Sequence, residues 1–268
     1  MKKFKVTRYQ IKTKKTSCRF TGKLCIVLLS DLHNECFGRN NDLLLREIDY
    51  QNPDLIAIAG DMLTAELEER ESIPLSLIQR LAEKYPVCYG NGNHECRMKM
   101  DTETFGKRYE YYAEGLRKSG VFLLENEYAD LMLKDIPLRI YGLELPQSYY
   151  KRYSRQKLQM QEVTEYLGKG TDERYQILLA HNPMCFDAYD AWGADLTMSG
   201  HLHGGFLRLP VFGGVISPQF VLFPEYDKGI FEKNGHHMVV SAGTGSHSRL
   251  PRIGNPRELV VVELLFTE

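Results

Sequence analysis

The sequence predicts an α/β fold whose central strands are mainly parallel. Short apolar runs alternate along the chain with stretches of helical apolar spacing, an order typical of a parallel sheet covered by helices. Each apolar run is continuous, which suits strands that are buried on both faces. We find no internal repeat, low-complexity tract or clear linker and therefore expect one domain over residues 1–268.

Five apolar runs are the predicted buried strands. In chain order they are KLCIVLLSD (23–31), PDLIAIAGD (53–61), YPVCYGNGN (85–93), YQILLAHN (175–182) and ADLTMSGH (194–201). Between them we expect helices over 40–52, where an asparagine is the candidate cap, over 73–85, and over 103–120, which ends at a glycine. After residue 205 the pattern changes to shorter strands, and 236–245 and 258–266 are the expected closing strands.

The composition is that of an ordinary globular protein, and its charge is balanced. The 34 Lys and Arg against 35 Asp and Glu give a net charge of −1, so the sequence carries no strong nucleic-acid signal. The first 23 residues are rich in Lys and Arg, and no acidic residue precedes Asp31. This segment is either a solvated strand pair or a patch that favours anionic lipid headgroups or phosphate groups.

The beginning of the chain does not resemble a signal peptide, because charges interrupt every apolar run before Cys25. No stretch reaches the length of a transmembrane helix. The six cysteines form no C-x-x-C pair, which argues against a thiolate zinc site or a disulfide framework. We therefore expect a cytoplasmic protein, with peripheral contact to an anionic membrane left open.

Potential metal ligands follow all five buried strands. The strands end in SDLH, GD, GNGNHE, AHNP and SGHLHGG. In open α/β sheets, ligands bind beyond the carboxyl ends of the strands, so these side chains should meet at one rim. The pair His201 and His203 would be unremarkable alone, but a continuing strand would point both toward this rim.

The candidate ligands combine two carboxylates, one carboxamide and several imidazoles. They are Asp31, His33, Asp61, Asn93, His181, His201 and His203, with His94 beside them. This set suits manganese, iron, zinc or cobalt and contains too many imidazoles for a typical magnesium site. Seven ligands exceed the needs of one ion and fit two ions that share a carboxylate, roughly 3.5–4 Å apart.

The order D-x-H, G-D, G-N-H-E, H and G-H-x-H resembles the calcineurin-like metallophosphoesterase superfamily. The stretch SGHLHGGFLRLP is similar to a bacterial subgroup whose last motif is G-H-x-H-G-G. The resemblance implies a four-layer fold, a two-sheet β-sandwich flanked by helices, with a dimetal site at the carboxyl ends of the strands. It spans nearly the whole chain and is weakest over 97–170.

The resemblance also implies a role for each candidate residue. One metal ion would be held by Asp31, His33, Asp61 and His203, and the other by Asp61, Asn93, His181 and His201. Asp61 is then the bridge, and a hydroxide between the ions attacks phosphorus. His94, a non-ligand, would stabilise the phosphoryl oxygens and protonate the leaving group. Glu95 would either orient an imidazole or cap a helix.

These features predict a phosphoric ester hydrolase with two divalent ions, Mn²⁺, Fe²⁺ or Zn²⁺. The substrate would be a small or lipid-linked phosphodiester, pyrophosphate or phosphomonoester, as for envelope-linked members of the subgroup. A nuclease, a cyclic-nucleotide phosphodiesterase and an inactive scaffold of the same fold remain alternatives. The stretch GDMLTAEL lacks the Asp-Arg pair of protein phosphatases, and His33 stands where purple acid phosphatases place a tyrosine.

Substrate recognition is expected in the segment 146–159, PQSYYKRYSRQKLQ. Its candidate residues are Tyr149, Tyr150, Lys151, Arg152, Tyr153 and Arg155. The segment is either a solvated helix start or a lid whose arginines bind a phosphate and whose tyrosines stack on a base or sugar. Arg208 and Arg249 are alternative phosphate ligands.

Overall fold

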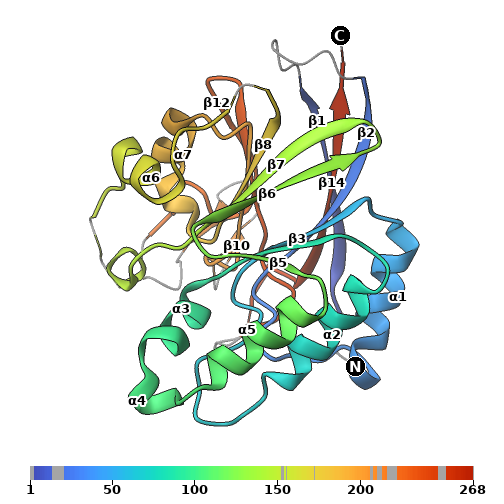
Figure 1. The fold of residues 1–268 in the computed structure, drawn as a ribbon, viewed down its shortest axis with the longest axis vertical. Coiled ribbons are helices and arrows are strands. Elements are labelled where there is room, and N and C mark those ends of the chain that lie inside the picture. Colours follow the sequence, from blue (N-terminus) through green and yellow to red (C-terminus); the bar gives the residue numbers. More distant parts are fainter. Residues whose placement is uncertain are drawn as a thin grey trace.

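Two six-stranded sheets pack face to face and are covered on their outer faces by helices (Figure 1). The structure is a computed structural model and describes residues 3–13, 21–151, 154, 156–171, 173–205, 208–209, 213–215, 222–246 and 252–267. The predicted α/β fold, a two-sheet sandwich flanked by helices, is confirmed.

The first sheet has the strand order β1-β14-β2-β3-β4-β5. Its strands are β1 (Lys5–Thr13), β14 (Glu258–Phe266), β2 (Gly22–Leu29), β3 (Leu55–Ala59), β4 (Val87–Gly90) and β5 (Phe122–Leu124). Strands β2 to β5 are parallel to one another, and β14 is antiparallel to β2. The basic segment at the start of the chain forms β1, whose side chains are exposed or half-buried except at Ile11, and residues 14–20 lie outside the described ranges.

The second sheet has the order β12-β13-β9-β8-β7-β6. Its strands are β12 (Gly229–Lys233), β13 (His236–Val240), β9 (Leu196–Ser199), β8 (Tyr175–Ala180), β7 (Ile136–Leu143) and β6 (Glu127–Leu133). The four inner strands are parallel, and each edge strand is antiparallel to its neighbour. A small separate ribbon pairs β10 (Arg208–Leu209) with β11 (Gly213–Gly214).

Helices cover the outer face of each sheet (Figure 1). Helices α1 (Asp42–Gln51), α2 (Ser72–Ala82) and α5 (Arg108–Lys118) lie against the first sheet, and α6 (Met160–Leu167) and α7 (Phe186–Trp192) against the second. The shorter elements are α3 (Asn93–Met100), α4 (Thr102–Phe105) and the 3-10 turns η1 (Arg39–Asn41), η2 (Gln147–Tyr150) and η3 (Pro183–Cys185).

Because side chains alternate along each strand, a single strand contributes residues to two separate cores, one on each face of its sheet. In β2, Leu24, Ile26 and Leu28 face the second sheet. Val27 and Leu29, between and after them, face the helices of the first sheet. A third core lies between the second sheet and α6 and α7. Strands buried on both faces need continuous apolar runs, which is why those runs located the strands in the sequence.

The five predicted buried strands are confirmed as β2, β3, β4, β8 and β9, and the closing strands as β13 and β14. The helix predicted over 103–120 is wrong as one element. Gly106, at φ +58°, separates α4 from α5, a conformation that side chains other than glycine rarely adopt. The candidate cap Asn41 makes no cap bond to α1; its Oδ1 accepts from the Phe37 N–H instead.

Within the described residues, no helix is both long enough and apolar enough to cross a lipid bilayer.

Candidate metal centre

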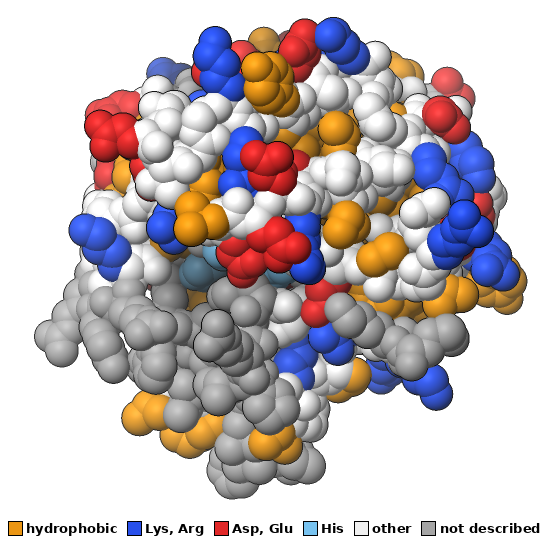
Figure 2. Space-filling model, turned by 90° about the horizontal axis from the view of Figure 1, so that it is seen from below, with side chains coloured by type: hydrophobic (Ala, Val, Ile, Leu, Met, Phe, Trp, Pro, Cys, Tyr) orange, Lys and Arg blue, Asp and Glu red, His pale blue; other side chains and the backbone are white. Residues whose placement is uncertain are grey.

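The carboxyl ends of β2, β3, β4, β8 and β9 bring the predicted ligands together although they come from both sheets. Three groups of His and Asp side chains have ligand atoms that all lie within 4.8 Å of one another. The first group is Asp31, His33 and His203; the second is Asp61, His181 and His201; and the third is His33, Asp61 and His94. In Figure 2, histidine side chains are visible in a recess on the face seen from below.

The first group surrounds a point between two imidazoles and a carboxylate. The Nε2 atoms of His33 and His203 are 3.2 Å apart. Asp31 Oδ1 lies 3.4 Å from Nε2 of His203 and 3.7 Å from Nε2 of His33. Two imidazole nitrogens and a carboxylate oxygen converging in this way form a donor set that borderline divalent cations prefer.

The second group contains Asp61, which also belongs to the group of His33 and His94. Its Oδ2 lies 3.0 Å from Nε2 of His181 and 3.9 Å from Nε2 of His94. Asp61 therefore lies between the imidazoles of two candidate ligand groups. His181 is held in place because its Nδ1 donates to the carbonyl of Ala59 at 2.6 Å, which leaves Nε2 facing the centre.

Two buried polar atoms of the candidate ligands have no hydrogen-bond partner among the described residues: Oδ1 of Asn93 and Nε2 of His201. Leaving such groups unsatisfied costs about 1–3 kcal/mol each, so buried polar atoms nearly always have a partner. A carboxamide oxygen and an imidazole nitrogen are atoms through which these residue types bind divalent cations. The residues present therefore fit divalent metal ions.

The pKa values of His181, His201 and Asp61 at the centre are strongly shifted by burial and by the charges of their neighbours. Burial alone would lower the pKa of His181, but the carboxylates of Asp61 and Asp31 raise it to about 10. Burial and the neighbouring charge of His181 lower the pKa of His201 to about 3. Burial opposes ionisation of Asp61, but the neighbouring His181 holds its pKa well below its ordinary value. His181 must release its proton before Nε2 can bind a cation. The metal affinity should therefore decrease as the pH is lowered.

The backbone at the centre is left-handed at five candidate ligands. The φ angles are +52° at Asp31, +51° at His33, +53° at Asp61, +70° at His201 and +51° at His203. This conformation is uncommon outside glycine and clusters at functional sites. It also corrects the expected strand geometry of H-x-H: β9 ends at Ser199, and the two histidines turn toward different ligand groups.

Two glycines let the loops after β3 and β4 touch. A Cβ on Gly60, at φ +82°, would overlap the backbone of Gly92, and a Cβ on Gly92 would overlap the carboxylate of Asp61. The close approach allows the His94 N–H to donate to Asp61 Oδ1 at 2.9 Å. The glycines of G-D and G-N-H-E therefore set the position of Asp61.

His94 is oriented by its second ring nitrogen. The Ala65 N–H donates to Nδ1 of His94 at 3.0 Å. A backbone N–H can only donate, so Nδ1 is the acceptor and the proton of the neutral ring is on Nε2, toward Asp61. The ring is half-buried, in contrast to the buried imidazoles of His181 and His201. His94 thus presents an N–H to the accessible side of the centre.

Glu95 is buried and binds the backbone of the loop that carries Asp61. Its carboxylate accepts from the N–H groups of Asp61 and Met62 at 2.9 Å and of Gly92 at 3.0 Å, and from the Tyr89 hydroxyl at 2.7 Å. Of the two expected roles, capping the start of α3 is confirmed through the bond from Gly92. The bonds to residues 61 and 62 were not foreseen and fix the backbone of Asp61.

Replacing Glu95 by glutamine should therefore weaken both the fold and the centre. One amide oxygen cannot replace two carboxylate oxygens, and the amide N–H₂ would meet backbone donors. We expect a loss of about 2–4 kcal/mol in the free energy of unfolding and a 10–100-fold loss of metal affinity, typical of groups that orient ligands. Guanidinium unfolding and metal titration measure the two effects, with the exposed Glu103→Gln as control. Wild-type values for both would refute this role.

The centre's sequence motifs also place the chain among known proteins. Residues 25–205, more than half of the chain, match the calcineurin-like phosphoesterase family. The chain belongs to this family. Membership supports a phosphoesterase function and implies divalent metal ions, in agreement with the donor set described above.

Named relatives of this calcineurin-like phosphoesterase are bacterial. The uncharacterized metallophosphoesterase YkuE of Bacillus subtilis is 26% identical over 84% of this chain and 73% of the relative. Phosphodiesterase YaeI of Escherichia coli is 25% identical over 90% of this chain and 82% of the relative. Among solved structures, the phosphopantetheinyl hydrolase PptH of Mycobacterium tuberculosis has a TM-score of 0.48 at 15% identity, covering 80% of this chain and 87% of that one.

The segment 146–159 does not begin with a solvated helix in this phosphoesterase. Gln147–Tyr150 form η2, and α6 begins only at Met160. Tyr149 is buried and its hydroxyl donates to Glu162 at 2.7 Å, so its expected stacking on a substrate is wrong. Tyr150 lies against the metal centre and Lys151 is exposed. Arg152, Tyr153 and Arg155 lie outside the described residues.

The structure describes one of the two predicted phosphate ligands after the last motif. Arg208 forms an ion pair with Asp227, and Arg249 is not among the described residues. Sequence analysis missed Thr64 and Arg252. Thr64 Oγ1 is 3.2 Å from Nδ1 of His33, and Arg252 Nη2 is 2.8 Å from Nδ1 of His203. Neither lies in a motif, so no local signal marks them.

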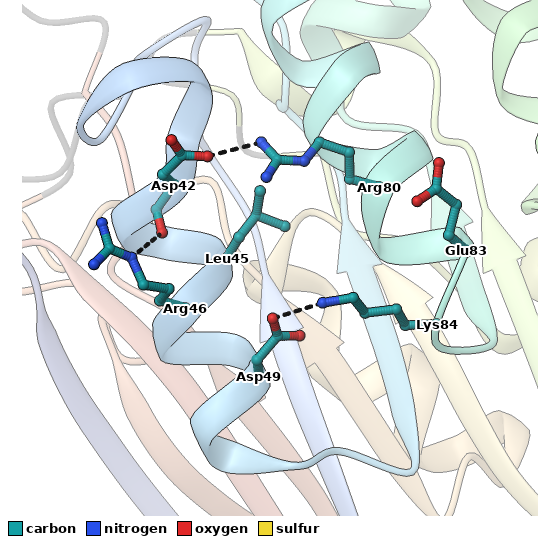
Figure 3. Close-up of a pocket in the computed structure, with 7 residues that line it drawn as sticks. All are labelled: Asp42, Leu45, Arg46, Asp49, Arg80, Glu83 and Lys84. Atoms are coloured by element: carbon teal, nitrogen blue, oxygen red, sulfur yellow. Dashed lines mark hydrogen bonds and ion pairs between the residues drawn. The ribbon is translucent and has the colours of Figure 1, made fainter.

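Two hollows differ in their relation to the centre. A cavity of about 370 Å³ opens beside the first ligand group; among its lining residues are His33, Asn34, Thr64, Glu66 and Arg70. A groove of about 470 Å³ lies between α1 and α2 (Figure 3). Its charges compensate one another, since Asp42 pairs with Arg80 and Asp49 with Lys84. Of these two hollows, the cavity beside His33 adjoins the candidate metal centre.

Proposed function

We propose that this calcineurin-like phosphoesterase is a dinuclear metal-dependent phosphodiesterase. The observation that carries the proposal is the place of Asp61, which belongs to a ligand group on each side of the centre. A single carboxylate with two free oxygens can bind two cations at once, whereas the amide of Asn93 cannot.

The proposed ligand sets follow the groups. Asp31, His33, Asp61 and His203 would hold one ion, and Asp61, Asn93, His181 and His201 the other. Divalent ions at such sites supply Lewis acidity toward phosphoryl oxygens and lower the pKa of bound water. Manganese, iron and zinc are the proposed metals, because the set mixes imidazole nitrogens with oxygens.

His94 is the proposed proton donor. It carries its proton on Nε2, and that atom faces Asp61 at 3.9 Å, beside the ligand groups. We propose that Nε2–H hydrogen-bonds to a phosphoryl oxygen and then transfers its proton to the departing alkoxide. The Ala65 N–H and the loop after β3 keep the ring in the required orientation.

A phosphodiester is the proposed substrate class. The name of the E. coli relative, Phosphodiesterase YaeI, supports it. The stretch GDMLTAEL also lacks the Asp-Arg pair expected of phosphoprotein phosphatases. Three further points are also proposals: a lipid-linked or pyrophosphate substrate, membership in the G-H-x-H-G-G subgroup, and a peripheral contact with the membrane. The complete ligand set argues against an inactive scaffold.

Removal of metal tests the proposal. Exhaustive chelation should abolish hydrolysis of bis-p-nitrophenyl phosphate, because the ligand groups then hold no cation. Manganese should restore turnover better than calcium, which prefers six to eight oxygen ligands and finds mainly imidazoles here. Elemental analysis should give about two transition-metal ions per chain at full occupancy.

A panel of monoesters, diesters and pyrophosphates, assayed with the manganese-loaded protein, tests the substrate class. The highest kcat/KM should fall on a diester. Full activity after chelation would refute the metal dependence. A preference for monoesters would refute the phosphodiesterase assignment but leave the metal centre in place.

A further inference from the structure

Tyr150 brings an aromatic ring to the edge of the metal centre. Its ring centroid is 5.0 Å from that of His201, in an edge-to-face arrangement, and 6.1 Å from that of His181. Both imidazoles belong to the second ligand group. The tyrosine is half-buried and packs in part against the third core.

The turn η2 fixes this ring from both sides. The Gln147 side-chain amide donates to the backbone carbonyl of Asn93 at 2.7 Å. The Asn182 amide donates to the carbonyl of Tyr149 at 3.0 Å. Asn93 and Asn182 belong to the loops after β4 and β8, which also carry candidate metal ligands. The turn is therefore held on the same two loops as the centre itself.

Tyr149 determines which way its neighbour points. Its side chain is buried in the third core with Leu158 and Val163, and its hydroxyl bonds to Glu162. Because the side chain of Tyr149 points into the core, the side chain of Tyr150 points to a different side of the turn, toward His181 and His201. The position of the ring thus follows from core packing and from the two side-chain bonds that hold η2, so the ring is preorganised before a ligand arrives.

The position of Tyr150 gives the centre an apolar wall among otherwise polar groups. Metal ligands and His94 can bind phosphoryl oxygens but offer nothing to the organic part of an ester. A flat aromatic face packs on another ring at centroid distances of 4.5–7 Å and gains about 0.5–1.5 kcal/mol beyond burial. An aliphatic group of one carbon gains little from the same face.

We propose that Tyr150 is a specificity-determining residue, whose ring contacts an aromatic or heteroaromatic group attached to the phosphorus bound at the metal centre. The inference rests on the proposed function, because it takes the second ligand group as the place where phosphorus binds. It assigns the selectivity to the ring and none to the hydroxyl.

Binding of two phosphonates tests this without requiring turnover. Phenylphosphonate and methylphosphonate share the phosphonate group and differ in the attached carbon group. The manganese-loaded full chain should bind phenylphosphonate about three- to tenfold more tightly in calorimetric titrations. Tyr150→Ala should bring the ratio close to one by weakening only the phenyl ligand, while Tyr150→Phe should retain it. Tyr150→Leu, which keeps most of the volume, serves if the alanine variant does not fold.

The control is Tyr111→Ala, which removes an exposed tyrosine of α5 and should leave the ratio unchanged. Manganese content, measured on each sample, shows that the centre is intact. An equal loss of both ligands in Tyr150→Ala would mean that the residue only supports His201 and would overturn the inference. So would a wild-type ratio near one, or a Phe variant that behaves like Ala. Failure of wild-type to hydrolyse diesters would refute the proposed function separately.

Discussion

Replacing Asp61 by asparagine is expected to remove both bound metal ions and nearly all turnover. Asp61 is 2% exposed and belongs to ligand groups on both sides of the centre. Asparagine keeps the shape but has one carbonyl oxygen and no charge, so it cannot join two cations. The loss in kcat/KM should exceed the 10–100-fold that follows changes in residues that merely orient ligands.

The matched control is Asp187→Asn, which neutralises an exposed carboxylate that pairs with Lys233 on the surface. It should keep wild-type activity and metal content. Elemental analysis and assays with bis-p-nitrophenyl phosphate compare the two variants. An Asp61→Asn protein that retained two ions per chain and turned over normally would show that this carboxylate is not shared.

Replacing His94 by asparagine should leave both metal ions in place and lower the rate by roughly 10²–10⁴-fold, the usual contribution of a general acid. The asparagine Oδ1 can still accept from the Ala65 N–H, which bonds to Nδ1 of His94 in the native protein. What disappears is the proton donor on the accessible side. The deficit should be smaller for p-nitrophenyl esters than for phenyl esters, because p-nitrophenolate leaves without needing a proton.

His236→Asn is the control for this experiment, since His236 lies on β13 and pairs with Asp190 outside the ligand groups. Rates with two leaving groups and the metal content together separate a proton donor from a metal ligand. A His94 variant that lost its metals would assign His94 as a ligand. Equal deficits for both leaving groups would exclude proton transfer.

The parts of the fold that sequence could predict are those in which one local pattern decides the structure. Strands β2, β3, β4, β8 and β9 are buried on both faces, so their apolar runs are continuous. Their ends carry the ligand types, and parallel strands place their carboxyl ends on one side. Sequence order alone therefore predicted the rim at which six of the candidate ligands meet, namely Asp31, His33, Asp61, His181, His201 and His203.

The parts that sequence could not predict depend on contacts between distant segments. The left-handed backbone of His201 and His203 directs them to different groups, whereas a strand would have aligned them. Two partners of Glu95, the N–H groups of Asp61 and Met62, lie 34 and 33 positions earlier in the chain, where β3 ends, and no local pattern predicts these bonds. The break at Gly106 had a signal, since glycine within a helix costs about 1 kcal/mol relative to alanine.

The position of β1 illustrates the same limit. Its charged composition predicted a solvated strand near the start of the chain, but not that it would pair in parallel with β14, at the other end of the sequence. Pairing partners far apart in the chain leave no trace in either segment alone. The central strands, by contrast, follow the order of alternating strands and helices.

Anomalous diffraction from crystals of the manganese-loaded protein tests the central claim most directly, because it locates the ions without reference to turnover. The account predicts two peaks roughly 3.5–4 Å apart, with the Asp61 carboxylate between them, one peak beside Asp31, His33 and His203 and the other beside Asn93, His181 and His201. A single peak, or two peaks that do not share Asp61, would contradict it.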